Sequence, residues 1–353
     1  MNKLYYLNHS KIDAYFKQSK DDFVVDEIPL YEFSGSGEHL VLKVRKKDLA
    51  TWDMLEIISN HTGCKIKDIG YAGLKDKNAM TIQHISIHKS FESQLSTLNH
   101  PQIKILETTY HENKIKMGHL KGNRFFIRIK RVQSIDKIKL ESALSQIAKN
   151  GMANYFGFQR FGIDGDNYLK GEAIVQGKLK ERNKTLKQMY INAYQSYLFN
   201  NWLSKRIEIS KMIENFDPKD IATKLNMDPK TLKEIAKQPH PFKIFHGDVM
   251  EHYPFGKIFY AQDLSSEAQK FFEHDRVPTG LLAGKKVKLA VGDALIFEQD
   301  FIKHTNEQGS RRYAWIFPQN ISSEYKEEKN WFELSFELPK GSYATELIAE
   351  LLH

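Results

Sequence analysis

The sequence predicts an α+β protein, and three observations indicate this class. Runs rich in β-branched residues dominate the first third of the chain. Apolar residues then take helical spacing from about residue 185, and strand-like patterning returns before a last helical stretch. We therefore expect a sheet-forming chain with a mostly helical segment in its middle.

The first expected elements are two strands and a helix. Residues 22–27 and 39–44 are β-branched-rich runs, and the Ser-Gly-Ser-Gly stretch 34–37 is typical of a turn. A helical pattern begins at Thr51, with three apolar residues on one face. These residues are Met54, Leu55 and Ile58.

Two further strands differ in how their faces alternate. In the strand expected over 79–87 the apolar phase slips between Ile82 and Ile85, so either both faces are partly buried or a bulge intervenes. The strand expected over 124–131 alternates one apolar with one basic face. Its apolar face holds Phe125, Ile127 and Ile129, and the other holds Phe126, Arg128 and Lys130.

Helices are expected next. Apolar and aromatic residues take helical spacing over 190–206. Two short helices follow, and each starts with a capping aspartate and a first-turn proline, at Asp217-Pro218 and Asp228-Pro229.

The rest of the chain mixes element types. Residues 240–292 are punctuated by Pro and Gly and indicate strands and turns. A strand over 331–336 and a helix over 344–352 complete the prediction.

Length and composition narrow the class. At 353 residues the chain suits about two domains, and 41% hydrophobic with 27% charged residues indicates a folded globular protein. We expect no secretion signal and no membrane span, because no long apolar run is present. The single cysteine, Cys64, excludes an internal disulfide. The expected compartment is the cytoplasm.

Basic residues gather in two places. The formal net charge is +8, and residues 114–131 hold seven basic residues and no acid. Residues 178–187 hold a second cluster with one acid. Basic clusters among aromatics are typical of a surface that binds a phosphate backbone, although a solvated face has the same pattern.

Several kinds of site lack their motifs. The chain has no GxGxxG, no GxxxxGK[ST], no HExxH and no GxSxG, so dinucleotide, P-loop, zinc-protease and nucleophile-elbow sites are not expected. Neither a cofactor nor a metal is expected.

Two segments stand out chemically. Asp76 follows a glycine-rich turn between Lys75 and Lys77, and adjacent cations favour an ionised carboxylate that serves as nucleophile or stabiliser. The alternative is a structural turn residue. Residues 154–162 carry four aromatics, which either stack on an unpaired base or form an aromatic core strand ending at Gly162.

These segments resemble a known family. Residues 73–83, Gly-Leu-Lys-Asp-Lys-Asn-Ala-Met-Thr-Ile-Gln, resemble the signature of the TruD family of tRNA pseudouridine synthases. Other family-like segments follow in order over nearly the whole chain, at 22–27, 37–39, 118–125, 154–162, 196–200, 278–280 and 338–345. One departure, within 278–284, is a missing second proline, which affects only local loop geometry.

The resemblance implies an activity and a catalytic pair. Family members isomerise uridine to pseudouridine in tRNA, typically at position 13, without cofactor or metal, and no obligatory protein partner is evident. Asp76 would be the nucleophile, attacking either the uracil ring or the ribose of a flipped-out uridine. Lys17 would be its basic partner.

The resemblance also implies binding residues. Phe156 would stack on the uracil, Asn154 would bind the substrate or fix its loop, and Phe23 and Tyr343 would line the pocket. Contacts to the tRNA backbone would come from Lys121, Arg124, Arg128 and Lys130.

The implied fold is the pseudouridine synthase core, an antiparallel sheet flanked by helices, with an inserted, mostly helical TRUD domain. We expect the insertion at 180–308 and a discontinuous catalytic domain formed by 1–179 and 309–353, with boundaries uncertain by ten residues or more.

Two other functions are weaker alternatives. Residues 121–127 faintly resemble the RNP1 pattern of an RRM, but an RRM is far shorter than this chain. Residues 221–236 have about the spacing of a DNA-binding helix-turn-helix, although a generic helical hairpin fits them better.

Overall fold

The computed structural model describes residues 3–16, 19–75, 77, 79–303, 305 and 307–353. The chain divides into two compact units, and each contains discontinuous segments. Unit 1 consists of Met1–Lys11, Ala143–Phe317 and Ser342–His353. Unit 2 consists of Ile12–Ser142 and Pro318–Gly341.

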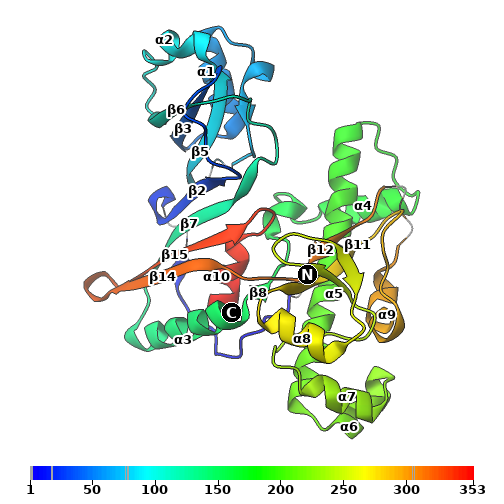
Figure 1. Ribbon diagram of the computed structural model, residues 1–353. Coiled ribbons are helices and arrows are strands. Elements are labelled where there is room, and N and C mark those ends of the chain that lie inside the picture. The colour runs from blue at the N-terminus through cyan, green and yellow to red at the C-terminus, as the bar shows by residue number, and fades with distance from the viewer. Residues whose placement is uncertain (1–2, 17–18, 76, 78, 304, 306) are drawn as a thin grey trace. The chain divides into compact units, whose positions relative to one another are not determined.

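Unit 2 is built on one sheet, whose strands run in the order β14-β15-β7-β2-β5-β3-β6 (Figure 1). Neighbours are antiparallel except for β2 and β5, which are parallel. The strands on this path are β2 (Phe23–Pro29), β3 (His39–Lys47), β5 (Met80–His88), β6 (Ile103–His111), β7 (Leu120–Lys130), β14 (Gln319–Lys326) and β15 (Trp331–Pro339). Two short strands, β1 (Tyr15–Phe16) and β4 (Gly70–Tyr71), pair with β7 and β5.

Strands β7 and β15 both alternate buried with more exposed residues, which fits their pairing side by side in the sheet. The predicted apolar face of β7 is buried at Phe125, Ile127 and Ile129, and β15 buries every second residue beside it. Their register is unbroken from Trp331↔Lys130 to Pro339↔Gly122. The predicted two-faced strand over 124–131 is therefore confirmed.

The register of β5 distinguishes between the two explanations for its irregular apolar pattern, a bulge or burial of both faces. Its pairing with β3 runs without a shift from His39↔His88 to Lys47↔Met80, so no bulge intervenes between these strands. Ile85, Ser86 and Ile87 are all buried. Both faces of β5 are therefore covered.

Helix α1 (Thr51–Thr62) packs on unit 2's sheet with Met54, Leu55 and Ile58 fully buried, as their spacing predicts. It ends at Gly63, whose φ of +77° favours glycine. A one-turn helix, α2 (Glu92–Leu95), lies beside it (Figure 1). The 3-10 turns of unit 2 are η1 (Lys20–Asp22), η2 (Ile66–Asp68), η3 (Lys89–Phe91) and η6 (Glu327–Lys329).

Unit 1 is organised around the long helix α5 (Lys184–Asn215). Its other helices are α4 (Asn167–Val175), α6 (Pro218–Leu225), α7 (Pro229–Ala236), α8 (Leu264–Phe272), α9 (Gly292–Glu298) and α10 (Ala344–Leu352), with 3-10 turns η4 (Phe158–Phe161) and η5 (Gln299–Phe301). Helix α3 (Ser134–Asn150) contains the boundary between the units. A sheet in the order β10-β9-β11-β12 consists of β9 (Val249–His252), β10 (Ile258–Tyr260), β11 (Arg276–Leu282) and β12 (Ser310–Tyr313), and β8 (Met152–Ala153) pairs with β13 (Trp315–Ile316).

The predicted helix starts in unit 1 are confirmed. Asp217 and Asp228 cap α6 and α7 by accepting hydrogen bonds from backbone amides, and a proline opens each helix. Helix α10 has the bounds expected from its apolar periodicity. The core of the unit is aromatic, with Trp202, Trp315 and Phe271 among its buried members.

The α+β class is confirmed, although the sheet of unit 2 is mixed and not purely antiparallel. The predicted insertion, 180–308, lies wholly inside unit 1, together with residues 143–179. Residue 180 is therefore not a border between compact units, and the insertion stays a prediction. Among the described residues no helix is long and apolar enough to cross a membrane.

Candidate active site

Asp76 and Lys17, the predicted nucleophile and its partner, lie outside the described residues. The residue before Asp76 is held at three points. The Lys75 amide donates to Thr51 Oγ1 at 2.8 Å, and its carbonyl accepts from Lys46 Nζ at 3.3 Å. Its own ammonium lies 2.8 Å from Glu27 Oε2. The chain is therefore fixed as it enters the segment with Asp76.

Each of these anchors has its own support. Thr51 is the first residue of α1 and also donates to Gln83 Oε1 on β5 at 3.0 Å. Lys46, on β3, is fully buried and donates to the Leu49 carbonyl at 2.5 Å. Helix α1 and strands β2 and β3 thus contact Lys75, and β5 supports Thr51.

Glu27 changes the charge balance expected around Asp76. Its buried carboxylate binds the Lys75 ammonium and also accepts from the His84 amide at 3.2 Å. Burial, aided by the charge of Lys43, lowers the pKa of His84 to about 4, so its ring is neutral near pH 7. The charge of Lys75 is therefore offset by Glu27, and its expected effect on the Asp76 carboxyl is reduced.

A second group of predicted residues lies together in unit 1, around Asn154. Asn154 Nδ2 donates to the Tyr313 carbonyl at 2.9 Å, and Oδ1 accepts from Arg312 Nη2 at 2.8 Å. The Asn154 carbonyl also accepts from the guanidinium of Arg312. The nitrogen and the oxygen of the Asn154 side-chain amide both have protein partners, so this arrangement favours a role in fixing the loop over a role in binding the substrate.

Phe156 is at the centre of this group and is only 7% exposed. Its amide donates to Asn200 Oδ1 at 2.9 Å, and its carbonyl accepts from Asn200 Nδ2 at 3.0 Å. The ring meets Phe199 edge-on at 5.6 Å and lies 6.1 Å from the ring of Tyr343. The guanidinium of Arg312 lies 3.9 Å from its ring centre.

The segment 154–162 is not the core strand considered as an alternative. Only Met152–Ala153 before it is a strand, and Phe158–Phe161 form a 3-10 turn. Gly157 lies so close to Tyr343 that an added Cβ would be 2.8 Å from Cδ1 of that ring. A glycine is therefore needed where the loop passes Tyr343.

Phe23 lies in unit 2 and is 8% exposed. Its ring packs edge-on against Phe16 at 5.6 Å and near Phe125 at 6.1 Å. These contacts give it a place in the core of unit 2, and a role as pocket wall stays a prediction.

The residues predicted to contact the tRNA backbone all lie on β7, but their charges differ in availability. Arg128 and Lys130 approach the buried carboxylate of Asp22 at 3.1 and 2.7 Å. Arg124 is paired with Glu337 at 2.7 Å, while its side chain stays 59% exposed. Lys121 is exposed and forms no ion pair with a described residue. Much of the basic face is thus neutralised within the sheet.

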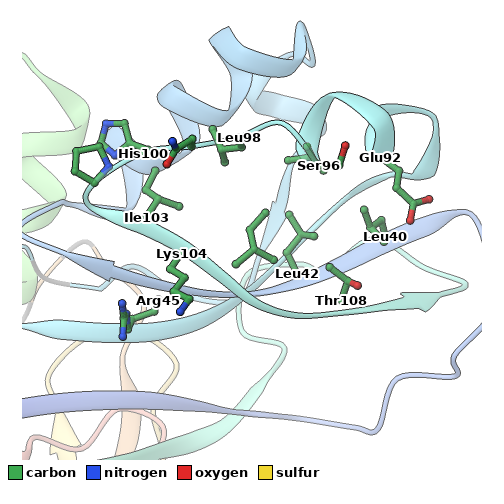
Figure 2. Close-up of a pocket in the computed structure, with 14 residues that line it drawn as sticks. Leu40, Leu42, Arg45, Glu92, Ser96, Leu98, His100, Ile103, Lys104 and Thr108 are labelled. Carbon is green, nitrogen blue, oxygen red and sulfur yellow. The ribbon is translucent and has the colours of Figure 1, made fainter.

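A hollow of about 640 Å³ in unit 2 lies elsewhere, and Figure 2 shows the residues that line it. Leu40, Leu42 and Ile103 give it an apolar side, while Arg45 and Lys104 lie at another. None of the described residues that the sequence predicts for the site lines it. The described residues also contain no group of acidic, histidine or cysteine side chains that could hold a metal.

Lys46, Arg312 and Asn200 are among the residues of these arrangements to which the sequence prediction gave no role in the site. Lys46 and Arg312 contact Lys75 and Asn154 across 29 and 158 positions of the chain, and no local pattern reports such contacts. Asn200 ends the family-like segment 196–200, which is the one signal that pointed to it.

Comparison with known proteins gives consistent matches along the chain. The family model described as tRNA pseudouridine synthase D (TruD) matches residues 1–183 and 178–351. The chain is 55% identical to tRNA pseudouridine synthase D of a Nitratiruptor species, covering 100% of this chain and 98% of that protein. It is 50% identical to the protein of the same name from Sulfurimonas denitrificans, covering 99% and 98%. A crystal structure of a TruD protein from Methanosarcina mazei has a TM-score of 0.73 at 21% identity, covering 99% of this chain and 95% of that one, and so shares the fold.

Proposed function

The chain belongs to the TruD family, and from this membership we propose that it converts uridine to pseudouridine in tRNA. The observation that carries the proposal is the match over the full chain to relatives named tRNA pseudouridine synthase D. The target, as is typical of the family, is the uridine at position 13.

The reaction exchanges one bond for another. The bond between uracil N1 and ribose C1′ breaks, the base turns, and a bond forms between C5 and C1′. The proton on C5 is lost and N1 gains one, so no electrons enter or leave and no water is consumed. The groups required are a nucleophile, a proton carrier and a site that holds the detached base.

Asp76 is the proposed nucleophile, attacking either the uracil ring or C1′. The hydrogen bonds and the ion pair that fix Lys75 support this role, because a nucleophile must be positioned precisely relative to its target. Lys17 is the proposed basic partner, favouring the ionised carboxylate. A positive charge from Lys17 matters more for the ionisation of Asp76 because Glu27 offsets the charge of Lys75.

Phe156 and Tyr343 are proposed to line the site for the extruded base. Their proximity supports a shared site, and Asn154 would hold the loop through its contacts to Tyr313 and Arg312. Phe23 is proposed as a further pocket residue. The target uridine leaves the stack before reaction, as enzymes that act on bases require.

The direct test is incubation of the purified protein with unmodified tRNA, followed by chemical mapping of pseudouridine. We expect one modified site at position 13 and none in a tRNA with cytidine there. Asp76→Asn should abolish the product while tRNA affinity stays within about twofold, because phosphate contacts dominate affinity. Binding without any product from the unaltered protein would favour an RNA-binding module, and product formed by Asp76→Asn would remove Asp76 from its role.

A further inference from the structure

Two arginines lie at the ring of Phe156. The guanidinium carbon of Arg312 is 3.9 Å from the ring centre, and that of Arg160 is 5.5 Å from it. Arg312 comes from β12 and Arg160 from the 3-10 turn η4, and both belong to unit 1. The fold thus brings two cations to one aromatic side chain.

Among the described residues no carboxylate forms an ion pair with Arg160 or Arg312. Glu346 favours the charge of Arg312 from a distance, but it is bound to Lys3 at 2.5 Å. Two other buried guanidinium groups of unit 1 are paired, that of Arg206 with Asp248 and that of Arg311 with Glu298. Burial, together with the charge of Arg160, lowers the pKa of Arg312, so the two cations disfavour one another and an anion bound by both would offset this repulsion.

Their remaining donors are available to such an anion. Arg160 Nε donates to Ser196 Oγ at 3.1 Å, and its two terminal amino groups have no acceptor among the described residues. Arg312 uses Nε and Nη2 on Asn154, which leaves Nη1. Planar guanidinium groups with free N–H edges match the oxygen atoms of a phosphate.

We propose that Arg160 and Arg312 form a phosphate subsite that binds the RNA phosphodiester next to the target uridine. The inference rests on the proposed function, because the base is taken to lie at Phe156. In a nucleotide one ribose separates the base from its phosphates, so cations beside the stacking ring suit this geometry. The subsite holds the backbone while the base is detached, which keeps C1′ in place for the second bond.

The test combines changes in the protein with changes in the RNA. A tRNA assembled from two synthetic strands carries a neutral methylphosphonate at the linkage 5′ or 3′ of the target uridine. Arg160→Gln removes the free guanidinium, and Arg160→Lys keeps the charge. Arg182→Gln is the matched control, since Arg182 is exposed in the same unit and has no ion pair with a described residue.

For one of the two linkages the methylphosphonate should lower the kcat/KM of the unaltered protein at least about tenfold, as expected for a lost hydrogen bond to a charged group. The same methylphosphonate should lower the kcat/KM of Arg160→Gln several-fold less than that of the unaltered protein, because only the contact with Arg312 is left to lose. Arg160→Lys should keep an intermediate sensitivity. In Arg182→Gln the methylphosphonate should act as strongly as in the unaltered protein.

Equal sensitivity of the unaltered protein and Arg160→Gln at both linkages would overturn the subsite. The same four comparisons are made on RNA affinity, which does not need turnover. If the unaltered protein forms no pseudouridine, the proposed function fails, and the affinity comparisons still decide whether Arg160 contacts the phosphate. Thermal unfolding of Arg160→Gln checks that the fold is retained.

Discussion

Thr51 shows how one side chain links the fold to the candidate nucleophile. Its hydroxyl accepts from the amide of Lys75, directly before Asp76, and donates to Gln83 on β5. The residue is buried at the start of α1, where its hydroxyl faces the loop and the sheet together. We expect the hydrogen bond to Lys75 to matter for activity, and the hydrogen bonds to Lys75 and Gln83 both to stabilise the fold.

Thr51→Val should separate these two effects. The change leaves the partly buried Lys75 amide without its acceptor and the buried Gln83 Oε1 without its donor, so we expect the free energy of unfolding to fall by about 1–3 kcal/mol. The kcat for pseudouridine formation should fall more than tenfold with little change in KM, because the loop loses an anchor.

Thr62→Val is the matched control for Thr51→Val. Thr62 is buried at the other end of α1, where it accepts from the Cys64 amide and donates to the Ile58 carbonyl. It should lower stability by a similar amount and leave kcat unchanged. A proportional loss of kcat in both variants would show that Thr51 acts through stability alone.

Phe156 combines packing with its proposed stacking role. Because it is 7% exposed, truncation to alanine would cost about 3–5 kcal/mol of stability and obscure any effect on substrate. Phe156→Leu keeps much of the volume and removes the ring. We expect turnover by folded protein to fall by the equivalent of about 1–3 kcal/mol, the worth of one stacked base, while tRNA affinity changes little.

Phe199→Leu provides the comparison for Phe156→Leu. The two rings are in contact, and Phe199 is fully buried. Both variants should lose similar stability in thermal unfolding, but only Phe156→Leu should lose turnover beyond the loss of folded protein. Equal turnover would assign Phe156 to the core.

At the scale of elements, β2 and β7 are joined by charge as well as by backbone hydrogen bonds. Asp22, directly before β2, is buried and receives Arg128 and Lys130 from β7. Burial alone would raise the pKa of Asp22, but hydrogen bonds from Lys130, Ser19 and Arg128 lower it below its usual 3.8. Asp22 therefore stabilises unit 2 above that pH, and this stabilisation is lost as the pH falls through its lowered pKa.

The double change Arg128→Gln and Lys130→Gln should reveal which role these residues have. It leaves the buried carboxylate of Asp22 without its two cations and with only Ser19 as a hydrogen-bond donor, so we expect a loss of about 3–5 kcal/mol in the free energy of unfolding at pH 7. Arg124→Gln on the same strand should cost less than about 1 kcal/mol, since its ion pair is exposed. If stability is kept and the salt dependence of tRNA binding flattens, the residues serve the phosphate backbone.

Helix α10 carries the buried carboxyl of Glu350, whose pKa is shifted in the opposite direction to that of Asp22. Glu350 Oε1 accepts from the Leu7 amide at 2.7 Å. Burial, the dominant cause, raises the pKa of Glu350 to about 7 from 4.5. Its protonated form is thus favoured in the folded state, and stability is lost as the pH rises from about 4.5 through 7.

Glu350→Gln should remove this pH dependence. At pH 8 the variant should be more stable than the unaltered protein by about 3 kcal/mol at most, and at pH 4.5 the two should be alike. Denaturant unfolding at both pH values measures the difference. Glu327→Gln, on the surface of unit 2, should behave as the unaltered protein does, and a Glu350→Gln protein that still follows the original profile would contradict the assignment.

At the scale of the whole molecule, the features that the sequence could predict are those that depend on residues close together in the chain. The caps of α6 and α7, the alternation of β7 and the periodicity of α10 are local, and each is found as expected. The family resemblance predicted the fold. The contacts of Arg312 with Asn154 and of Lys46 with Lys75 could not be predicted, because they form only when distant segments meet.

The last strand and helix of the chain each complete a different unit, and this has a consequence for biosynthesis. Strand β15 covers one edge of β7, and α10 receives the Leu7 amide on Glu350. At about 5–20 residues per second, a ribosome finishes β15 some 10–40 s after β7. Throughout that interval the nascent chain carries an open strand edge in one unit and an unfilled helix position in the other. Neither unit can close before these segments have been synthesised, and a premature stop after residue 330 would leave both units unfinished.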